Sequence, residues 1–153
     1  MKEENIESNE RVKLLSQMIG LDPKFWPNPI PRNLQIHLMK VSEGYIKFQV
    51  TVSKDWLNGL HIMHGGIMVT LMDEAMGVAG FTLNMQQRYA TIDLNVDYIS
   101  SAREGEVLLI HGKIEKSGKQ LLRASAYIET ESGKLISKST SNLLKFEPKQ
   151  AKS

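Results

Sequence analysis

The sequence predicts an α+β fold in which an antiparallel sheet curls around one long helix. Residues 65–84 are apolar on nearly every side of a helix, which is typical of a helix enclosed by other structure. Alternating apolar and polar residues precede and follow this segment, as expected of strands with one buried face. Tight links that contain glycine join the later strands, so these strands should run antiparallel. One enclosed helix and such a sheet together define the α+β class.

The first 33 residues are expected to form an N-terminal helix and a Pro-rich connector. A one-sided apolar stripe predicts the helix; it consists of Val12, Leu15 and Ile19. The four prolines at positions 23, 27, 29 and 31 predict an extended connector, because proline cannot donate to a hydrogen-bonded ladder. The main domain should then cover residues 34–146, and residues 147–153 should form a flexible tail.

Six strands are expected, two before the long helix and four after it. The strand-like runs are residues 34–41, 45–52, 89–99, 106–116, 121–130 and 135–146. In the third run, one face should carry the apolar residues Ile92, Leu94, Val96 and Tyr98. Thr91 and Asp93 should lie on its other face.

The size and charge of the chain limit its possible functions. With 153 residues, it is long enough for one well-buried core and too short for two ordinary domains. Its 19 basic and 17 acidic residues are mostly interspersed and give a net charge of +2. This balance lacks the broad positive field of a duplex-binding protein, so no nucleic-acid partner is expected.

A cytoplasmic protein without a membrane span is expected. The first ten residues lack the apolar stretch of a secretory signal, and the absence of cysteine excludes disulfides and thiolate metal sites. Residues 67–85 are predominantly apolar and about long enough to cross a bilayer. However, Asp73 and Glu74 fall near the middle of this segment, where each carboxylate would be unfavourable in lipid. A buried helix of a soluble protein fits better.

Asp73 and Glu74 are the only charged residues between Gly65 and Gln86. An ionised carboxylate in such apolar surroundings is unfavourable without partners. One interpretation is that the acids pass through a gap in the sheet and meet solvent; the other is that one of them is catalytic. Because adjacent helix positions lie about 100° apart, the two acids need not share an environment.

The segment His64-Gly65-Gly66 begins the predicted helix. N–H groups at a helix start lack partners and carry partial positive charge, which suits a developing oxyanion. A glycine turn that only starts a helix is the alternative. Gly65 lies eight residues before Asp73, roughly 12 Å along a helix, which is too far for both to act on one carbonyl within a single chain. Two subunits with antiparallel helices would bring Gly65 of one near Asp73 of the other.

The predicted sheet also favours an oligomer. A six-stranded sheet wrapped on one helix leaves long edge strands, and pairing edges between two copies would cover them. We therefore expect at least a homodimer. A homotetramer built as a dimer of dimers is expected on the same grounds, and the sequence does not choose between the two.

The run Asn58-x5-His64-Gly65-Gly66-x6-Asp73 is followed by Thr91-x-Asp93-x-Asn95-x-x-Tyr98. This pattern resembles the hotdog-fold acyl-CoA thioesterases of the PaaI type and the related 4-hydroxybenzoyl-CoA thioesterases. The resemblance covers roughly residues 35–146. It implies a hotdog fold and hydrolysis of acyl-CoA thioesters, with CoA as part of the substrate and no cofactor.

The resemblance implies a role for each matched position. Asp73 matches the acid that acts as nucleophile or as general base on water. Gly65 matches the residue whose backbone N–H, from the partner subunit, polarises the thioester carbonyl. Asn58 and His64 match residues that shape the loop around that carbonyl. Thr91 matches a hydroxyl that in some relatives orients the attacking water, and it should reach the acid of the partner.

Further residues are expected to contact the substrate. Those near the thioester and the acyl group are Gly66, Met72, Glu74 and Met76. The basic residues expected at the phosphates of CoA are Arg88, Arg103, Lys116 and Lys119. No metal site is expected, because zinc-type spacing with acids is absent from the histidines His37, His61, His64 and His111.

Two other functions are alternatives to a thioesterase. A non-catalytic hotdog module would bind an acyl-CoA or an acyl chain, but a pure binder does not need the pattern from Asn58 to Thr91 in register. A hydratase or dehydratase acting on acyl thioesters would need a paired acid and histidine. The order of His64 and Asp73 does not suit that chemistry well.

Overall fold

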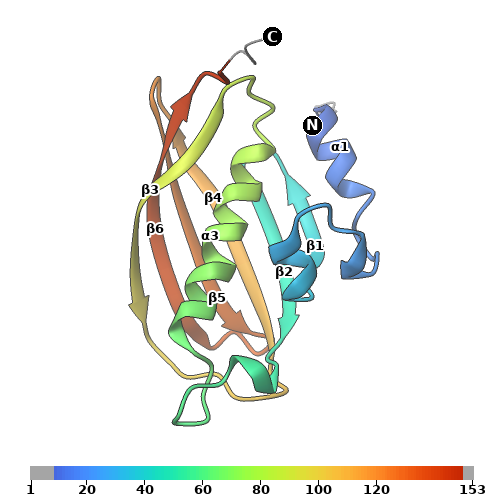
Figure 1. Cartoon of the computed structure of the whole chain (residues 1–153), viewed down its shortest axis with the longest axis vertical. Coiled ribbons are helices and arrows are strands. Elements are labelled where there is room, and N and C mark those ends of the chain that lie inside the picture. Colours follow the sequence, from blue (N-terminus) through green and yellow to red (C-terminus); the bar gives the residue numbers. More distant parts are fainter. Residues whose placement is uncertain (1–8, 150–153) are drawn as a thin grey trace, which may run out of the picture.

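The computed structural model describes residues 9–149 and contains a six-stranded antiparallel sheet with the strand order β1-β2-β4-β5-β6-β3. The strands are β1 (His37–Ser42), β2 (Tyr45–Thr51), β3 (Arg88–Tyr98), β4 (Val107–Ser117), β5 (Leu121–Thr130) and β6 (Leu135–Phe146). The helices are α1 (Glu10–Ser16), η1 (Pro23–Phe25), α2 (Pro29–Asn33), η2 (Lys54–Trp56) and α3 (Gly65–Phe81). The sheet curls around α3, which lies in its hollow (Figure 1). The α+β hotdog arrangement predicted from the sequence is confirmed.

Helix α3 packs against the inner face of the sheet and forms the centre of the core. Its fully buried residues include Leu71, Met72, Ala75, Met76 and Ala79. Helix and sheet come very close at Gly112 of β4, because a Cβ there would lie 2.5 Å from backbone atoms of Ala75. The helix ends at Phe81, three residues before the predicted end, and Asn84 then takes a left-handed conformation that stops helices. No helix in residues 9–149 is long and apolar enough to span a membrane.

We expect Gly112→Ala to lower the melting temperature strongly. The added methyl group would meet the backbone of α3 rather than the end of a flexible side chain, so helix and sheet must separate. Overpacking of this kind costs about 1–3 kcal/mol, and occasionally more. Thermal unfolding followed by circular dichroism measures the effect. Gly59→Ala is the matched control, because a Cβ at Gly59 meets open space; equal melting temperatures for the two variants would contradict this packing.

The Pro-rich segment is not the extended connector that the sequence predicted. It forms η1 and α2, each of which begins at a proline. Proline suits the first position of a helix, because its φ is already helical and the missing N–H would have no partner there. Between the two helices, Trp26 is buried and donates its Nε1–H to the carbonyl of Ile36 at 2.8 Å. Its ring packs edge-on against Phe48, so the segment is fixed to the core.

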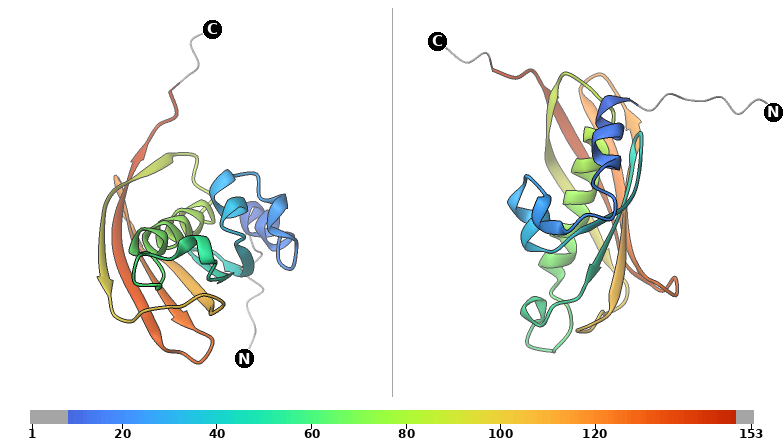
Figure 2. Two further views of the ribbon diagram at one scale, coloured as in Figure 1. Left: turned by 60° about the horizontal axis from the view of Figure 1, so that its bottom comes forward. Right: turned by 90° about the vertical axis from the view of Figure 1, so that its right-hand side faces the viewer.

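The predicted N-terminal helix is present as α1 and lies beside the sheet-and-helix body (Figure 2). Asn9 caps it by accepting a hydrogen bond from the N–H of Val12 at 3.0 Å. Val12 and Leu15 are buried as predicted. Ile19 lies beyond the end of the helix and is 44% exposed, so the apolar stripe is shorter than the sequence indicated.

Strand β3 contains a β-bulge that changes which residues face the helix. The register with β6 shifts between Thr91 and Asp93, which leaves Ile92 as the extra residue. Ile92 is 57% exposed, so its predicted place on the buried face is wrong. Thr91, predicted to lie on the opposite face, instead turns toward α3. The bulge is the physical reason for both corrections.

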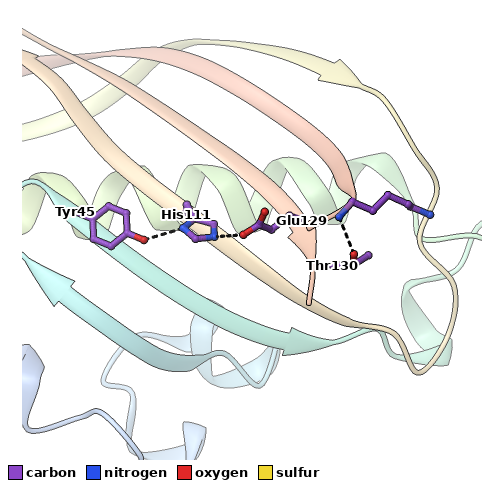
Figure 3. Close-up of polar contacts among 5 residues, drawn as sticks. Tyr45, His111, Glu129 and Thr130 are labelled. Carbon is purple, nitrogen blue, oxygen red and sulfur yellow. Dashed lines mark hydrogen bonds and ion pairs between the residues drawn. The ribbon is translucent and has the colours of Figure 1, made fainter. Parts of the chain in front are cut away.

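A chain of polar side chains crosses the outer face of the sheet (Figure 3). Gly112 faces α3, so the adjacent His111 points to the opposite face. The Tyr45 hydroxyl lies 2.8 Å from Nδ1 of His111, and Nε2 lies 2.9 Å from Oε1 of Glu129. The His111 ring also stacks on Tyr127, with 4.3 Å between ring centroids. These contacts join β2, β4 and β5.

We expect His111 to make the protein less stable in mild acid. Burial is the main cause that lowers the pKa of His111 from its ordinary value of 6.5, and Glu129 opposes this shift. The unfolded chain therefore binds a proton at higher pH than the folded chain does. The free energy of unfolding is thus fully maintained above pH 6.5 and falls as the pH drops below it.

Urea denaturation at about pH 7.5 and about pH 5.5 tests this dependence. Replacing His111 with Gln should reduce the difference in unfolding free energy between the two pH values. The matched control is His37→Gln on β1, where the side chain is exposed. An unchanged pH dependence in the His111 variant would show that this histidine does not cause it.

Candidate active site

Asp73 lines a cavity of about 740 Å³ between α3, β3 and the N-terminal segment, which we define as residues 9–33. The Thr91 hydroxyl donates a hydrogen bond to Oδ1 of Asp73 at 2.8 Å. Both residues belong to one chain, whereas the sequence predicted that Thr91 reaches the acid of the partner. Within residues 9–149, Oδ2 of Asp73 receives no hydrogen bond. One carboxylate oxygen is thus fixed while the other can face a substrate or water.

Glu74 lines the same cavity but has different surroundings. Burial, and secondly the charge of Asp73, raise the pKa of Glu74 above its ordinary value of 4.5. Nearby, the Tyr89 hydroxyl donates to the carbonyl of Gly77 at 2.6 Å, and burial raises the pKa of Tyr89 to about 12. Tyr89 is therefore neutral at physiological pH. Of the two acids, Asp73 is the one held by a hydroxyl donor.

The segment His64-Gly65-Gly66 starts α3. His64 caps the helix, and its Nδ1 accepts a hydrogen bond from the N–H of Gly66 at 2.8 Å. The N–H of Gly65 has no acceptor among the residues that the structure describes, as its place at the first helical position implies. A Cβ on Gly65 would lie 2.9 Å from the ring of Tyr98, so glycine allows this close approach. The N–H of Gly65, rather than that of Gly66, is therefore available to a ligand.

Asn58 orders the loop that leads to this helix start. Its Oδ1 accepts a hydrogen bond from the N–H of Leu60 at 2.9 Å and a longer one from the N–H of Ile62 at 3.4 Å. Its own N–H donates to the carbonyl of Ile62 at 2.9 Å. These contacts shape the loop, whereas a contact between Asn58 and the substrate stays a prediction.

The carboxylate and the free N–H lie in different hollows of the chain. Asn58 and Gly65 line a second cavity of about 400 Å³ together with Tyr98. Asp73 lines the first cavity, eight residues and roughly 12 Å further along α3. One chain therefore presents the two groups separately, as the spacing in the sequence predicted.

The other predicted site residues are spread over the molecule. Met72 and Met76 are fully buried and line neither cavity, because both side chains belong to the core. The basic residues are exposed but are not gathered in one place. One end of the sheet carries Arg88, Lys116 and Lys119, and the β3–β4 link at the other end carries Arg103. Contacts between any of these residues and a substrate stay predictions.

The N-terminal segment contributes cavity residues that were not among the predicted site residues. These are Leu14, Leu15, Met18, Phe25, Trp26, Pro27 and Asn28. An available signal was the density of large apolar residues in a segment too short to bury them by itself. Within residues 9–149, no group of three or more His, Asp or Glu side chains is placed to hold a metal ion.

An enclosed helix with a carboxylate in its middle and a free N–H at its start places this chain among the hotdog-fold proteins. A family model described as the Thioesterase superfamily matches residues 60–137, which contain both of these groups. The chain belongs to the thioesterase superfamily, a family of thioester hydrolases.

Individual proteins of known name agree with this assignment. The chain is 32% identical over 103 residues to acyl-coenzyme A thioesterase 13 of Mus musculus, covering 67% of this chain and 74% of that protein. It superposes on the Escherichia coli PaaI protein from the phenylacetic acid degradation operon with a TM-score of 0.74 and 20% identity, covering 78% and 86% of the two chains. A protein from Streptococcus pneumoniae described as a hypothetical thioesterase, solved with coenzyme A, gives a TM-score of 0.70 and 21% identity, covering 75% and 88% of the two chains. The chain spans 66% to 74% of the length of the first four curated relatives that it matches.

Proposed function

We propose that this chain hydrolyses acyl-CoA thioesters to a free acid and CoA, with Asp73 as the catalytic carboxylate. The observation that carries the proposal is the Asp73–Thr91 hydrogen bond in a mostly apolar cavity, in a member of the thioesterase superfamily. A thioester is already activated, so its hydrolysis needs a positioned carboxylate and an oxyanion donor rather than a catalytic triad. The names of the mouse thioesterase and the CoA-bound streptococcal structure support CoA as the thiol.

Two chemical routes use the same residues. In the first, Asp73 attacks the carbonyl carbon, the C–S bond breaks, and CoA leaves as a thiolate that takes up a proton. Water then hydrolyses the mixed anhydride and releases the acid. In the second route, Asp73 removes a proton from water, the resulting hydroxide attacks the carbonyl, and the proton passes to the departing sulfur. In both routes the N–H of Gly65 stabilises the negative charge on the carbonyl oxygen.

The arrangement of β3 supports a homodimer with a shared active site. This strand is an edge of the sheet, and exposed apolar residues lie along it and just beyond it at Ile92, Tyr98 and Ile99. On this strand, Thr91 lies next to Asp73 of α3, and Tyr98 lies next to Gly65 at the start of α3. Pairing two β3 edges antiparallel about the point between Leu94 and Asn95 would place Thr91 of one chain opposite Tyr98 of the other. Each Asp73 would then lie near the partner subunit's Gly65.

Three further expectations belong to the proposal. The assembly is at least a homodimer, and a homotetramer formed from two dimers is its larger form. The exposed residues Arg88, Arg103, Lys116 and Lys119 are candidates for contacts with the phosphates of CoA. The enzyme acts in the cytoplasm.

Thiol release from a panel of short, medium, long and aryl acyl-CoAs tests the proposed activity. We expect release of one equivalent of CoA for each acid formed with at least one member of the panel. A protein that bound an acyl-CoA tightly and released no thiol would instead be a non-catalytic binding module. Calorimetric titration of the same compounds measures that binding.

A further inference from the structure

The N-terminal segment forms one wall of the cavity that holds Asp73. Leu14, Met18 and Phe25 line the cavity from this segment, while Val78 and Phe81 line it from α3. The segment lies beside the open side of α3, outside the curled sheet (Figure 2). Elements that are not part of the sheet-and-helix core therefore limit the space next to the catalytic carboxylate.

Hydrogen bonds fix this wall to the end of α3. The Arg11 guanidinium donates to the carbonyls of Phe81 at 3.3 Å and Met85 at 2.8 Å, and it lies 4.6 Å from the centroid of the Phe81 ring. The Asn9 side-chain amide donates to the carbonyl of Thr82 at 2.8 Å. The last carbonyls of a helix lack intrahelical partners and carry partial negative charge, so a cation is stabilising there. The wall consequently has a defined position relative to α3.

The size of the cavity indicates which acyl groups it can hold. A water molecule occupies about 30 Å³ of liquid, and a methylene group is of similar size, so eight carbons would take about 240 Å³. The cavity of about 740 Å³ has room for such a chain and for a thioester beside Asp73. An acetyl group would leave most of the apolar wall without contacts.

The charges around the cavity indicate which acyl groups it would reject. Asp73 and Glu74 are the charged residues that line it, and no Lys or Arg is among the described residues of its lining. A carboxylate at the far end of an acyl chain would meet no cation there. It would also lose its hydration against an apolar wall, which is unfavourable.

We propose that the N-terminal segment is the specificity-determining wall of the acyl site. It selects thioesters of uncharged, apolar acyl groups of about eight or more carbons over acetyl groups and over acyl groups with a terminal carboxylate. This inference rests on the proposed thioesterase function and adds the part of the chain that selects the acyl group. Met18 and Phe25 contact the acyl group in this arrangement, whereas the fully buried Met72 and Met76 do not.

Gly77 offers a way to fill the cavity without disturbing the fold. It lies one turn after Asp73 on α3 and lines the cavity, and a Cβ placed on it meets nothing within 4 Å. Replacing a helical glycine generally improves helix propensity. Gly77→Leu should therefore place a side chain in the acyl space while α3 stays intact.

The test measures kcat/KM by thiol release for acetyl-CoA, octanoyl-CoA and the CoA monothioester of an eight-carbon dicarboxylic acid. The native protein should prefer octanoyl-CoA over both other thioesters. Gly77→Leu should lower kcat/KM for octanoyl-CoA at least about tenfold and change that for acetyl-CoA less than about threefold. Met18→Ala should raise KM for octanoyl-CoA about fivefold, because it removes side-chain contacts with the acyl group. The burial of one methylene strengthens binding by up to about fourfold, which sets the scale of this loss.

Ile19→Ala is the matched control for Met18→Ala, because Ile19 is the adjacent residue, is exposed and does not line the cavity. It should leave KM within about twofold. If the Met18 and Gly77 variants change all three thioesters equally, the N-terminal segment is not the acyl wall. Efficient hydrolysis of the dicarboxylic thioester would also overturn the inference. If the native protein releases no thiol from any acyl-CoA, the proposed function itself fails.

Discussion

Replacing Asp73 with Asn should reduce kcat/KM for the best acyl-CoA at least about a thousandfold. Asparagine has the same shape and its Oδ1 can still accept the hydrogen bond from Thr91, so the cavity keeps its geometry. The amide is neutral and can neither attack a carbonyl nor remove a proton from water. The loss should therefore appear mainly in kcat. Circular dichroism and size-exclusion chromatography should show an unchanged fold and assembly.

Glu74→Gln is the matched control, because it removes the neighbouring acid on the same helix. The raised pKa of Glu74 means that its uncharged form is more accessible than that of an ordinary glutamate, and glutamine imitates that form. We expect a change of less than about tenfold in kcat/KM for this variant. Equal losses at both positions would indicate a site shared by two carboxylates. Full activity of the Asp73 variant would show that Asp73 is not the catalytic carboxylate.

Replacing Gly65 with Ala should lower kcat at least about tenfold, because the new methyl group would stand beside the N–H that we propose polarises the thioester carbonyl. The methyl group would also lie 2.9 Å from the ring of Tyr98. Tyr98 is 58% exposed, so its ring can turn away and the fold should survive. Adding Tyr98→Ala relieves this contact and separates the two effects. Turnover that returned in the double variant would show that packing against Tyr98, and not access to the N–H, caused the loss.

The long helix and the strands could be predicted from the sequence because their patterns are local. Apolar residues on every side of the helix predict α3, and period-two alternation predicts strands, most regularly β2. Asp73 in the middle of this helix and Gly65 at its start can also be identified from the sequence, because a charged residue and a glycine are unusual among apolar residues. The sequence alone therefore predicts Asp73 and Gly65 on one helix.

Other features depend on contacts that the sequence does not display. The bulge at Ile92 reverses the alternation within β3, yet the apolar and polar residues still alternate in the sequence, so Thr91 was assigned to the wrong face. The prolines predict an extended connector, although those at 23 and 29 each begin a short helix. The sequence does not reveal the wall of the cavity, because Met18 and Asp73 of α3 line one cavity only in the tertiary fold.

The central claim is that each active site combines Asp73 of one subunit with Gly65 of its partner. Mixing the impaired variants Asp73→Asn and Gly65→Ala, after dissociation and reassociation of the subunits, tests it most directly. Half of the dimers should be mixed, and one of the two sites in each mixed dimer contains both native residues. The mixture should therefore recover about a quarter of the native activity. If both residues acted within one chain, no mixed dimer would contain an intact site and the mixture would stay as inactive as its components.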